Sequence, residues 1–312
     1  MKPFRKNVAI AIDGGGIRGV IVARALMKLE AALSKPSHQI FQLSAGTSTG
    51  SIISAGIGAG LTASQIFDLY VQLGETIFKK SWRNVLWPFT RYRYSNEPLI
   101  QALYGALGDM NMRNFWEMNP PFDVVITTFD LLENKTRFIK PWKEEYKDWS
   151  VLSSVLASSS VPTYFPVVDG RLVDGGVGSY ANPCYLAAYE ASFCLHWDPA
   201  ETTLISLGTG REAQNTINPG QPQKFWAWNW ISPLLGAFLS SADNQQVHLV
   251  ETFFEKLDFR RYQVDLTESI GMDDPAAIPA LINYGDKMGS MLLRDQYDTA
   301  MGILPEQIIY GV

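Results

Sequence analysis

This 312-residue sequence has few cysteines and histidines, and its net charge is not positive. Its two cysteines, Cys184 and Cys194, have no CxxC spacing and no histidine cluster around them. This argues against a disulfide framework and favours thiols in a reducing compartment. With 26 basic and 31 acidic residues the net charge is −5, whereas nucleic-acid-binding domains are normally basic. We therefore expect no nucleic-acid partner.

Long hydrophobic runs are also missing, and no segment reaches the length of a membrane-spanning helix. The first apolar run, Val8 to Ile12, is too short for the core of a signal peptide and predicts a buried strand instead. The longest apolar and aromatic stretch, 225–239, is interrupted by Asn229 and Pro233, which suits a surface position better than a bilayer interior. We therefore expect a cytoplasmic protein, soluble or peripheral to the inner membrane face.

Strand-like and helix-like segments alternate along the chain as far as Arg211. Apolar, β-rich runs predict strands at 7–12, 40–44, 122–128, 135–139 and 203–207. Apolar residues at helical spacing predict helices at 20–33, 63–78, 98–107 and 151–157, and Asp169-Gly170 predicts a hairpin turn. Such alternation predicts an α/β fold whose mostly parallel sheet is covered by helices on both faces. We expect one domain, 1–312, in which 212–312 forms a helical C-terminal part.

One pentapeptide, Gly46-Thr47-Ser48-Thr49-Gly50, stands between a predicted strand and an apolar, small-residue helix. This is the G-x-S-x-G pattern of a nucleophile elbow, in which a serine occupies a sharp strand-to-helix turn. Glycines two residues before and after the serine are needed, because Cβ atoms there would clash in the strained turn. The pattern favours Ser48 as a nucleophile, although serine, threonine and glycine also cap helices that have no catalytic role.

A second glycine loop, Asp13 to Gly19, follows the first predicted strand and allows two interpretations. Gly14, Gly16 and Gly19 match the G-x-G-x-x-G pattern of a dinucleotide site, but no acidic residue ends the next strand to hold a ribose. Alternatively, Gly14, Gly15 and Gly16 expose backbone N–H groups that stabilise a developing oxyanion. Arg18 opposes the dipole of the following helix, which indicates either a function or a solvated side chain.

A serine nucleophile needs a base, and the sequence offers three histidines. His38 precedes the strand that leads to Ser48 and is expected near its far end, His196 lies between aromatic residues, and His248 falls in a helix-like stretch. None of these placements favours catalysis. Asp174 ends a short apolar run and precedes two glycines that let other backbone approach closely. A buried aspartate can accept the serine proton directly, because burial raises its pKa toward the working range.

Three segments in this order, DGGGIRG (13–19), GTSTG (46–50) and DGG (174–176), resemble the signature blocks of the patatin-like phospholipases. Further similarity lies in Ser160-x-Pro162-x-x-Phe165-Pro166, in Asn182-Pro183 and in SLGTG (206–210). The resemblance spans 7–211 and stops there.

This resemblance implies a three-layer α/β fold and a serine acyl hydrolase that releases fatty acids from phospholipids or other lipid esters. Carried over residue by residue, Ser48 is the nucleophile, Asp174 the general base, and Gly14, Gly15 and Gly16 form an oxyanion hole bordered by Arg18. The family uses neither a metal nor a cofactor. Some bacterial members are switched on by cyclic nucleotides and controlled by oligomerisation, so the resemblance allows a homo-oligomer and a cyclic-nucleotide activator bound by 212–312.

Two other functions stay open at this point. A Ser-Asp-His triad would use His196 or His248, which follow Asp174 in the order of α/β-hydrolases. A nucleotide-binding regulatory module would use the glycine loop for phosphate and leave Ser48 structural.

Finally, the segment 79–94 mixes cations with aromatic residues and contains no aspartate or glutamate. Tryptophan and tyrosine favour the headgroup region of a bilayer, and each cation near an anionic membrane adds about 1 kcal/mol of attraction. The pattern predicts contact with a membrane surface, with 225–230 as a second anchor. The alternative is that these aromatic side chains belong to the core.

Overall fold

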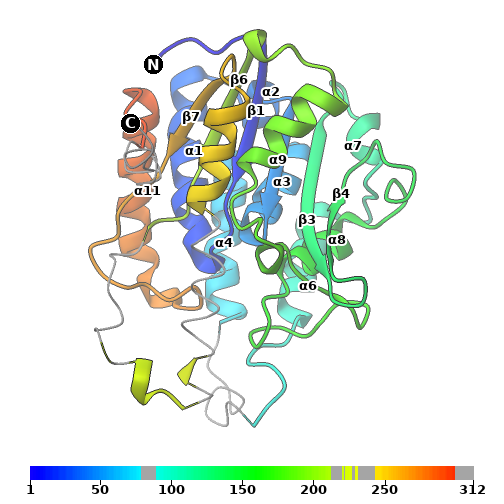
Figure 1. Cartoon of the computed structure of the whole chain (residues 1–312), viewed down its shortest axis with the longest axis vertical. Coiled ribbons are helices and arrows are strands. Elements are labelled where there is room, and N and C mark those ends of the chain that lie inside the picture. The colour runs from blue at the N-terminus through cyan, green and yellow to red at the C-terminus, as the bar shows by residue number, and fades with distance from the viewer. Residues whose placement is uncertain (79–88, 212–219, 221, 227–228, 231–242, 299–312) are drawn as a thin grey trace, which may run out of the picture.

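The computed structural model describes residues 1–78, 89–211, 220, 222–226, 229–230 and 243–298, and its elements are arranged around one twisted sheet (Figure 1). The strands are β1 (Asn7–Ile12), β2 (Leu43–Thr47), β3 (Asp123–Asp130), β4 (Lys135–Ile139), β5 (Leu172–Asp174), β6 (Thr202–Leu207) and β7 (Asp258–Tyr262). They lie in the order β4-β3-β2-β1-β6-β7, with β5 also paired to β3. The neighbouring pairs β3-β2, β2-β1, β1-β6 and β6-β7 are parallel, whereas β4 and β5 run antiparallel to β3.

Helices cover both faces of this sheet, which confirms the predicted three-layer α/β fold (Figure 1). One face carries α1 (Gly19–Leu33), α3 (Thr49–Gly58), α4 (Ala63–Thr76), α6 (Glu97–Leu107), α8 (Val151–Ser159) and α11 (Ile278–Leu293). The other carries α9 (Cys184–Tyr189) and the helix 243–253, and the short helices α2 (Ser37–Ile40) and α7 (Asn114–Glu117) precede β2 and β3. Alternate residues of β1 serve the two faces: Ile10 and Ile12 pack into one core, Ala9 and Ala11 into the other.

The predicted strand 40–44 is displaced, because β2 begins only at Leu43. Ser37–Ile40 forms α2 instead, and the Glu30 carboxylate accepts hydrogen bonds from the N–H groups of Ser37 (2.7 Å) and Ala63 (3.0 Å). Glu30 thus joins α1, α2 and α4. The hairpin prediction is confirmed, because Asp169 and Gly170 have φ angles of 49° and 66° between the bridged residues Val168 and Leu172.

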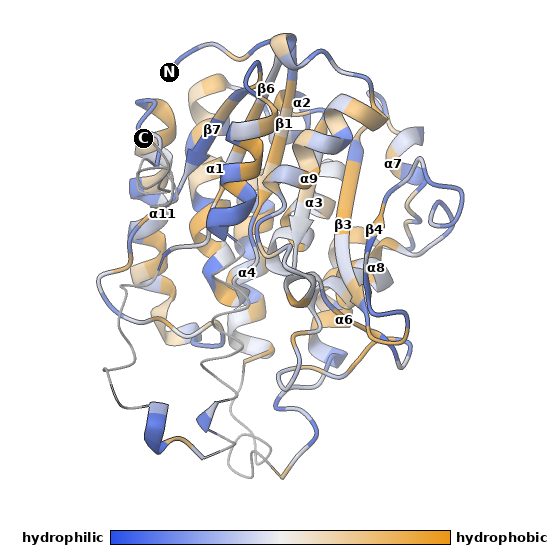
Figure 2. Ribbon diagram, in the orientation of Figure 1, coloured by the Kyte–Doolittle hydropathy of each residue, from blue (hydrophilic) through white to orange (hydrophobic). Residues whose placement is uncertain are grey.

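The strand β7 was not predicted, because its sequence DFRRY has no hydrophobic run and is hydrophilic in Figure 2. It nevertheless lies beside β6, and both Arg260 and Arg261 are buried. The sheet therefore includes a strand from 212–312, a part of the chain for which only helices were expected.

Neither cysteine forms a disulfide: Cys184 is buried and Cys194 partly exposed. None of the described helices is both long and apolar enough to cross a membrane. Of the predicted membrane-contact segment, 79–88 lies outside the described residues. Within the remainder, Tyr94 is buried against Phe78 and Phe165, so this aromatic side chain belongs to the core.

Candidate active site

Ser48 occupies the turn between β2 and α3, as the G-x-S-x-G pattern predicts. Its φ and ψ of 54° and −123° are unusual for a residue with a side chain. A Cβ atom on Gly46 would lie 2.2 Å from the Gly50 carbonyl oxygen, and one on Gly50 would lie 2.1 Å from the Ile12 carbonyl oxygen. Both glycines are therefore required by close backbone approach.

Serines of α8 hold this turn from the other side. The Ser48 N–H donates to Ser158 Oγ at 2.9 Å, and Ser159 Oγ donates to the Ser48 carbonyl oxygen at 3.3 Å. A further bond comes from Ser51 Oγ to the same carbonyl at 2.6 Å. The strained backbone of Ser48 is thus fixed by three side chains. For the two serines of α8, the only sequence signal was the run Ser158-Ser159-Ser160 at the end of a predicted helix.

Asp174 ends β5 and is 1% exposed. Its Oδ1 accepts the Gly176 N–H at 2.8 Å, while its Oδ2 is buried without a hydrogen-bond partner among the described residues. Burial raises the pKa of this carboxyl to about 6, and the neighbouring Ser48 hydroxyl and the Gly176 N–H partly offset that effect. The carboxyl is therefore close enough to Ser48 to interact with it and has one oxygen available as an acceptor.

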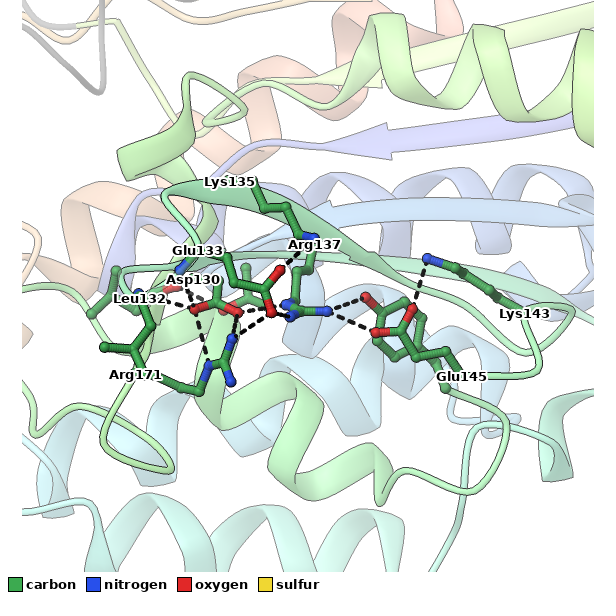
Figure 3. Close-up of polar contacts among 11 residues, drawn as sticks. Asp130, Leu132, Glu133, Lys135, Arg137, Lys143, Glu145 and Arg171 are labelled. Atoms are coloured by element: carbon green, nitrogen blue, oxygen red, sulfur yellow. Dashed lines mark hydrogen bonds and ion pairs between the residues drawn. The ribbon is translucent and has the colours of Figure 1, made fainter.

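Two features bring β5 to this position. A Cβ atom on Gly175 would lie 2.1 Å from Thr127 Oγ1, so only glycine allows the chain after Asp174 to pass so close to β3. At the other end of β5, Arg171 and Arg137 bind the buried Asp130, with Nε–Oδ distances of 3.0 and 2.7 Å (Figure 3). These hydrogen bonds hold the pKa of Asp130 well below its usual range.

The glycine loop lies directly against the serine, because a Cβ atom on Gly14 would be 3.2 Å from Ser48 Cβ. The Gly14 N–H already donates to the Ala181 carbonyl oxygen at 2.9 Å. By contrast, the N–H groups of Gly15 and Gly16 have no acceptor in the part of the chain that the structure describes. Of the three glycines predicted for the oxyanion hole, two therefore keep an unused backbone donor. Arg18 caps α1 beside them.

A buried charge network supports the loop from the C-terminal part of the chain. Arg261 on β7 donates to both carboxylate oxygens of Asp13, at 2.9 and 2.5 Å, and to Asp243 at 2.9 Å. Asp243 also accepts a bond from Asn182 Nδ2 at 2.6 Å. Since Asp13 immediately precedes Gly14, this network fixes the start of the loop. This network could not be predicted from the sequence, because no local pattern connects residues 13, 182, 243 and 261.

The three histidines are not brought to Ser48. His38 and His196 precede β2 and β6, whereas Ser48 follows β2, so both histidines lie toward the opposite edge of the sheet. His248 lies on the helix 243–253, where its ring nitrogen is 3.5 Å from Thr252 Oγ1. The geometry favours a site without histidine.

An apolar pocket begins at Ser48 and extends between α3, α4, α6 and the segment after α8. Almost all of its surface is apolar. Its lining residues are Gly16, Ile17, Ser48, Thr49, Ile52, Tyr70, Leu73, Ile77, Phe78, Leu99, Ser159, Val161, Tyr164, Phe165 and Met272. Such a pocket suits a hydrocarbon chain attached to a group that reacts at Ser48.

An α/β sheet with a serine in a strained G-x-S-x-G turn, a buried aspartate beside it and two backbone N–H groups without an acceptor among the described residues is compatible with hydrolase chemistry. A family model described as "Patatin-like phospholipase" matches residues 10–188, and the chain belongs to this family. It is therefore a lipid acyl hydrolase.

Similar proteins agree with the family, and a solved structure agrees with the fold. The chain is 28% identical to "Patatin-like protein 2" of Oryza sativa subsp. indica over 91% of this chain and 83% of the relative. It is 26% identical to "Patatin-17" of Solanum cardiophyllum over 89% and 82% of the two chains. The crystal structure of VipD from Legionella pneumophila has the same fold, with a TM-score of 0.51 and 10% identity over 94% of this chain and 67% of that one.

Proposed function

We propose that the protein releases fatty acids from membrane phospholipids through a dyad of Ser48 and Asp174. The observation that carries this proposal is the unpartnered Oδ2 of a buried Asp174, whose raised pKa suits a general base, beside a serine on a nucleophile elbow. The apolar pocket that begins at Ser48 supports a long acyl chain as the part of the substrate that binds there.

The reaction needs two displacements at the acyl carbon. Ser48 Oγ attacks the ester carbonyl while Asp174 Oδ2 takes its proton, and the N–H groups of Gly15 and Gly16 stabilise the oxyanion. The alcohol of the lipid then leaves with that proton. In the second half, Asp174 accepts a proton from water, the resulting hydroxide attacks the acyl-serine, and the fatty acid departs as Ser48 regains its proton.

A serine-directed fluorophosphonate probe tests this proposal when it is combined with analysis of the lipid products. The wild-type protein should be labelled on Ser48 and should release fatty acid, and Ser48→Ala should do neither. Ser54→Ala is the matched control, because this serine lies on α3, the helix that follows Ser48, hydrogen-bonds to Ser44 at 2.7 Å and stays outside the pocket. Undiminished labelling of Ser48→Ala would refute the assignment of the nucleophile.

A further inference from the structure

The turn between β3 and β4 presents two adjacent leucines to solvent. Leu131 is 49% exposed and Leu132 is 72% exposed. Single exposed apolar residues are common on protein surfaces, but two neighbouring leucines at the end of one hairpin form a small continuous apolar patch. We call this pair the leucine tip.

The backbone under the leucine tip is held tightly. The buried Asp130 carboxylate accepts the N–H groups of Leu132 and Glu133 at 3.1 and 3.2 Å, and it binds Arg137 and Arg171 at the same time (Figure 3). The Leu131 N–H donates to the Arg171 carbonyl oxygen at 2.9 Å. These bonds fix the turn with its leucines outside, so the tip cannot readily fold back onto the core.

The leucine tip stands at the edge of the sheet that carries Ser48. β3 runs parallel to β2, and Thr127 is paired with Thr47, the residue before Ser48. Asp130 lies three residues beyond Thr127, which places the following turn about 10 Å farther along the strand direction. In Figure 1 the labelled strands β1 and β3 run downward, so this edge faces the lower part of the picture.

We propose that the leucine tip inserts into the acyl-chain region of a lipid bilayer and holds Ser48 at the membrane surface, an inference that rests on the proposed function. A bilayer fits better than a protein partner, because two side chains are far too small for a stable protein interface but suffice for shallow insertion. The two carboxylates beside the tip do not oppose this contact, because Glu133 is ion-paired with Lys135 and Asp130 with Arg171.

Vesicle co-sedimentation tests the contact independently of catalysis. In a Ser48→Ala background, binding to phosphatidylcholine vesicles, with and without phosphatidylglycerol, is compared for the parent, Leu132→Glu and Leu131→Glu/Leu132→Glu. Phe253→Glu is the matched control, because this side chain is also apolar and is 68% exposed. It lies at the end of the helix 243–253, near the start of β7 and so at the opposite end of the strands from the leucine tip. The double variant should bind about tenfold more weakly on both vesicle types, Leu132→Glu should be intermediate, and the control should match the parent.

A catalytic measurement with Ser48 present completes the test. The leucine-tip variants should hydrolyse phosphatidylcholine in vesicles about tenfold more slowly but cleave a soluble short-chain ester at the wild-type rate. Equal vesicle binding by the double variant and its parent, or no binding by the parent, would overturn the role of the tip. Equal losses on both substrates would also overturn it, since they indicate damage to the fold. A wild-type protein that binds vesicles through the tip but hydrolyses no lipid would refute the proposed function instead.

Discussion

At Asp174 two effects on the carboxyl pKa act in opposite directions. Burial penalises the charged form, while the Ser48 hydroxyl and the Gly176 N–H stabilise it, and burial has the larger effect because the side chain is 1% exposed. The result is a pKa of about 6, so the carboxyl is ionised at neutral pH yet remains more basic than an exposed aspartate.

A pH–rate profile should report this pKa. The proposed base is active when deprotonated, so kcat/KM for a soluble ester should be constant above the pKa of about 6 and fall about tenfold per pH unit below it. Measurement of kcat/KM from about pH 4.5 to 8, with circular dichroism to confirm the fold, checks this expectation. A profile without any decline on the acid side would argue against Asp174 as the base.

The same shift has a consequence for stability. Because the folded-state pKa lies above the ordinary value of 3.8, folding favours the protonated form, and stability declines as the pH rises from about 4 to about 6. Asp174→Asn should therefore be at least as stable as the wild type at neutral pH, measured by urea denaturation, while its turnover falls at least about a thousandfold. Marked destabilisation at neutral pH would contradict the raised pKa.

Gly15 gives a steric prediction in the same loop. A Cβ atom there would lie 2.2 Å from Thr209 Oγ1 and 2.7 Å from Thr209 Cβ, so Gly15→Ala must displace either the loop or Thr209. Loss of a positioned oxyanion donor should lower kcat by about a hundredfold. In a Thr209→Gly background, which removes the clashing side chain, Gly15→Ala should lower kcat much less. The double variant is therefore compared with Thr209→Gly alone. A folded Gly15→Ala enzyme with normal kcat would remove this amide from the mechanism.

At the scale of elements, β7 connects the C-terminal part of the chain to the site. Its Arg261 is buried and ion-paired with two carboxylates, one at the start of the glycine loop and one on the helix 243–253. A buried guanidinium is tolerated only when paired in this way, and removing it leaves Asp13 and Asp243 facing each other without a cation.

Arg261→Met should therefore reduce the free energy of unfolding by about 3–5 kcal/mol, measured by urea denaturation. Arg24→Met is the matched control, because its ion pair with Asp286 is about one-third exposed and should contribute no more than about 1 kcal/mol. The Arg261→Met protein that remains folded should also show a lower kcat at nearly unchanged KM, since the glycine loop is proposed to stabilise the transition state and not the bound substrate. Equal stability losses in the two variants would contradict the role assigned to this network.

The elements also differ in how well their sequences predict them. β1 has a continuous apolar run, and α1 and α4 have apolar residues at helical spacing. All three were predicted close to their observed bounds. β7 was not, because a strand that buries arginines against distant carboxylates has no hydrophobic signal of its own. Likewise, the motifs pointed to Ser48 and Asp174, but their proximity depends on the antiparallel pairing of β5 with β3. No motif indicated that the Gly14 N–H is occupied by a hydrogen bond to the Ala181 carbonyl oxygen.

At the scale of the whole molecule, the parallel strands β1, β2 and β6 all end at one edge, and the groups proposed for chemistry collect there. The glycine loop follows β1, Ser48 follows β2, and the leucine tip projects beyond β3 at the same edge. Two of the three histidines precede their strands and so lie at the other edge. Because of this polarity, neither of these two imidazoles is placed to take part in the proposed reaction.

A variant without any histidine tests this central claim most directly. His38→Gln, His196→Asn and His248→Gln are combined, with asparagine at 196 because the φ of 56° there favours it. Its kcat/KM on a soluble ester is measured beside the wild type and Asp174→Asn, with circular dichroism to confirm that all three are folded. The account predicts turnover within about tenfold of the wild type for the histidine-free variant and a loss of at least about a thousandfold for Asp174→Asn. A folded histidine-free variant as inactive as Asp174→Asn would contradict the dyad.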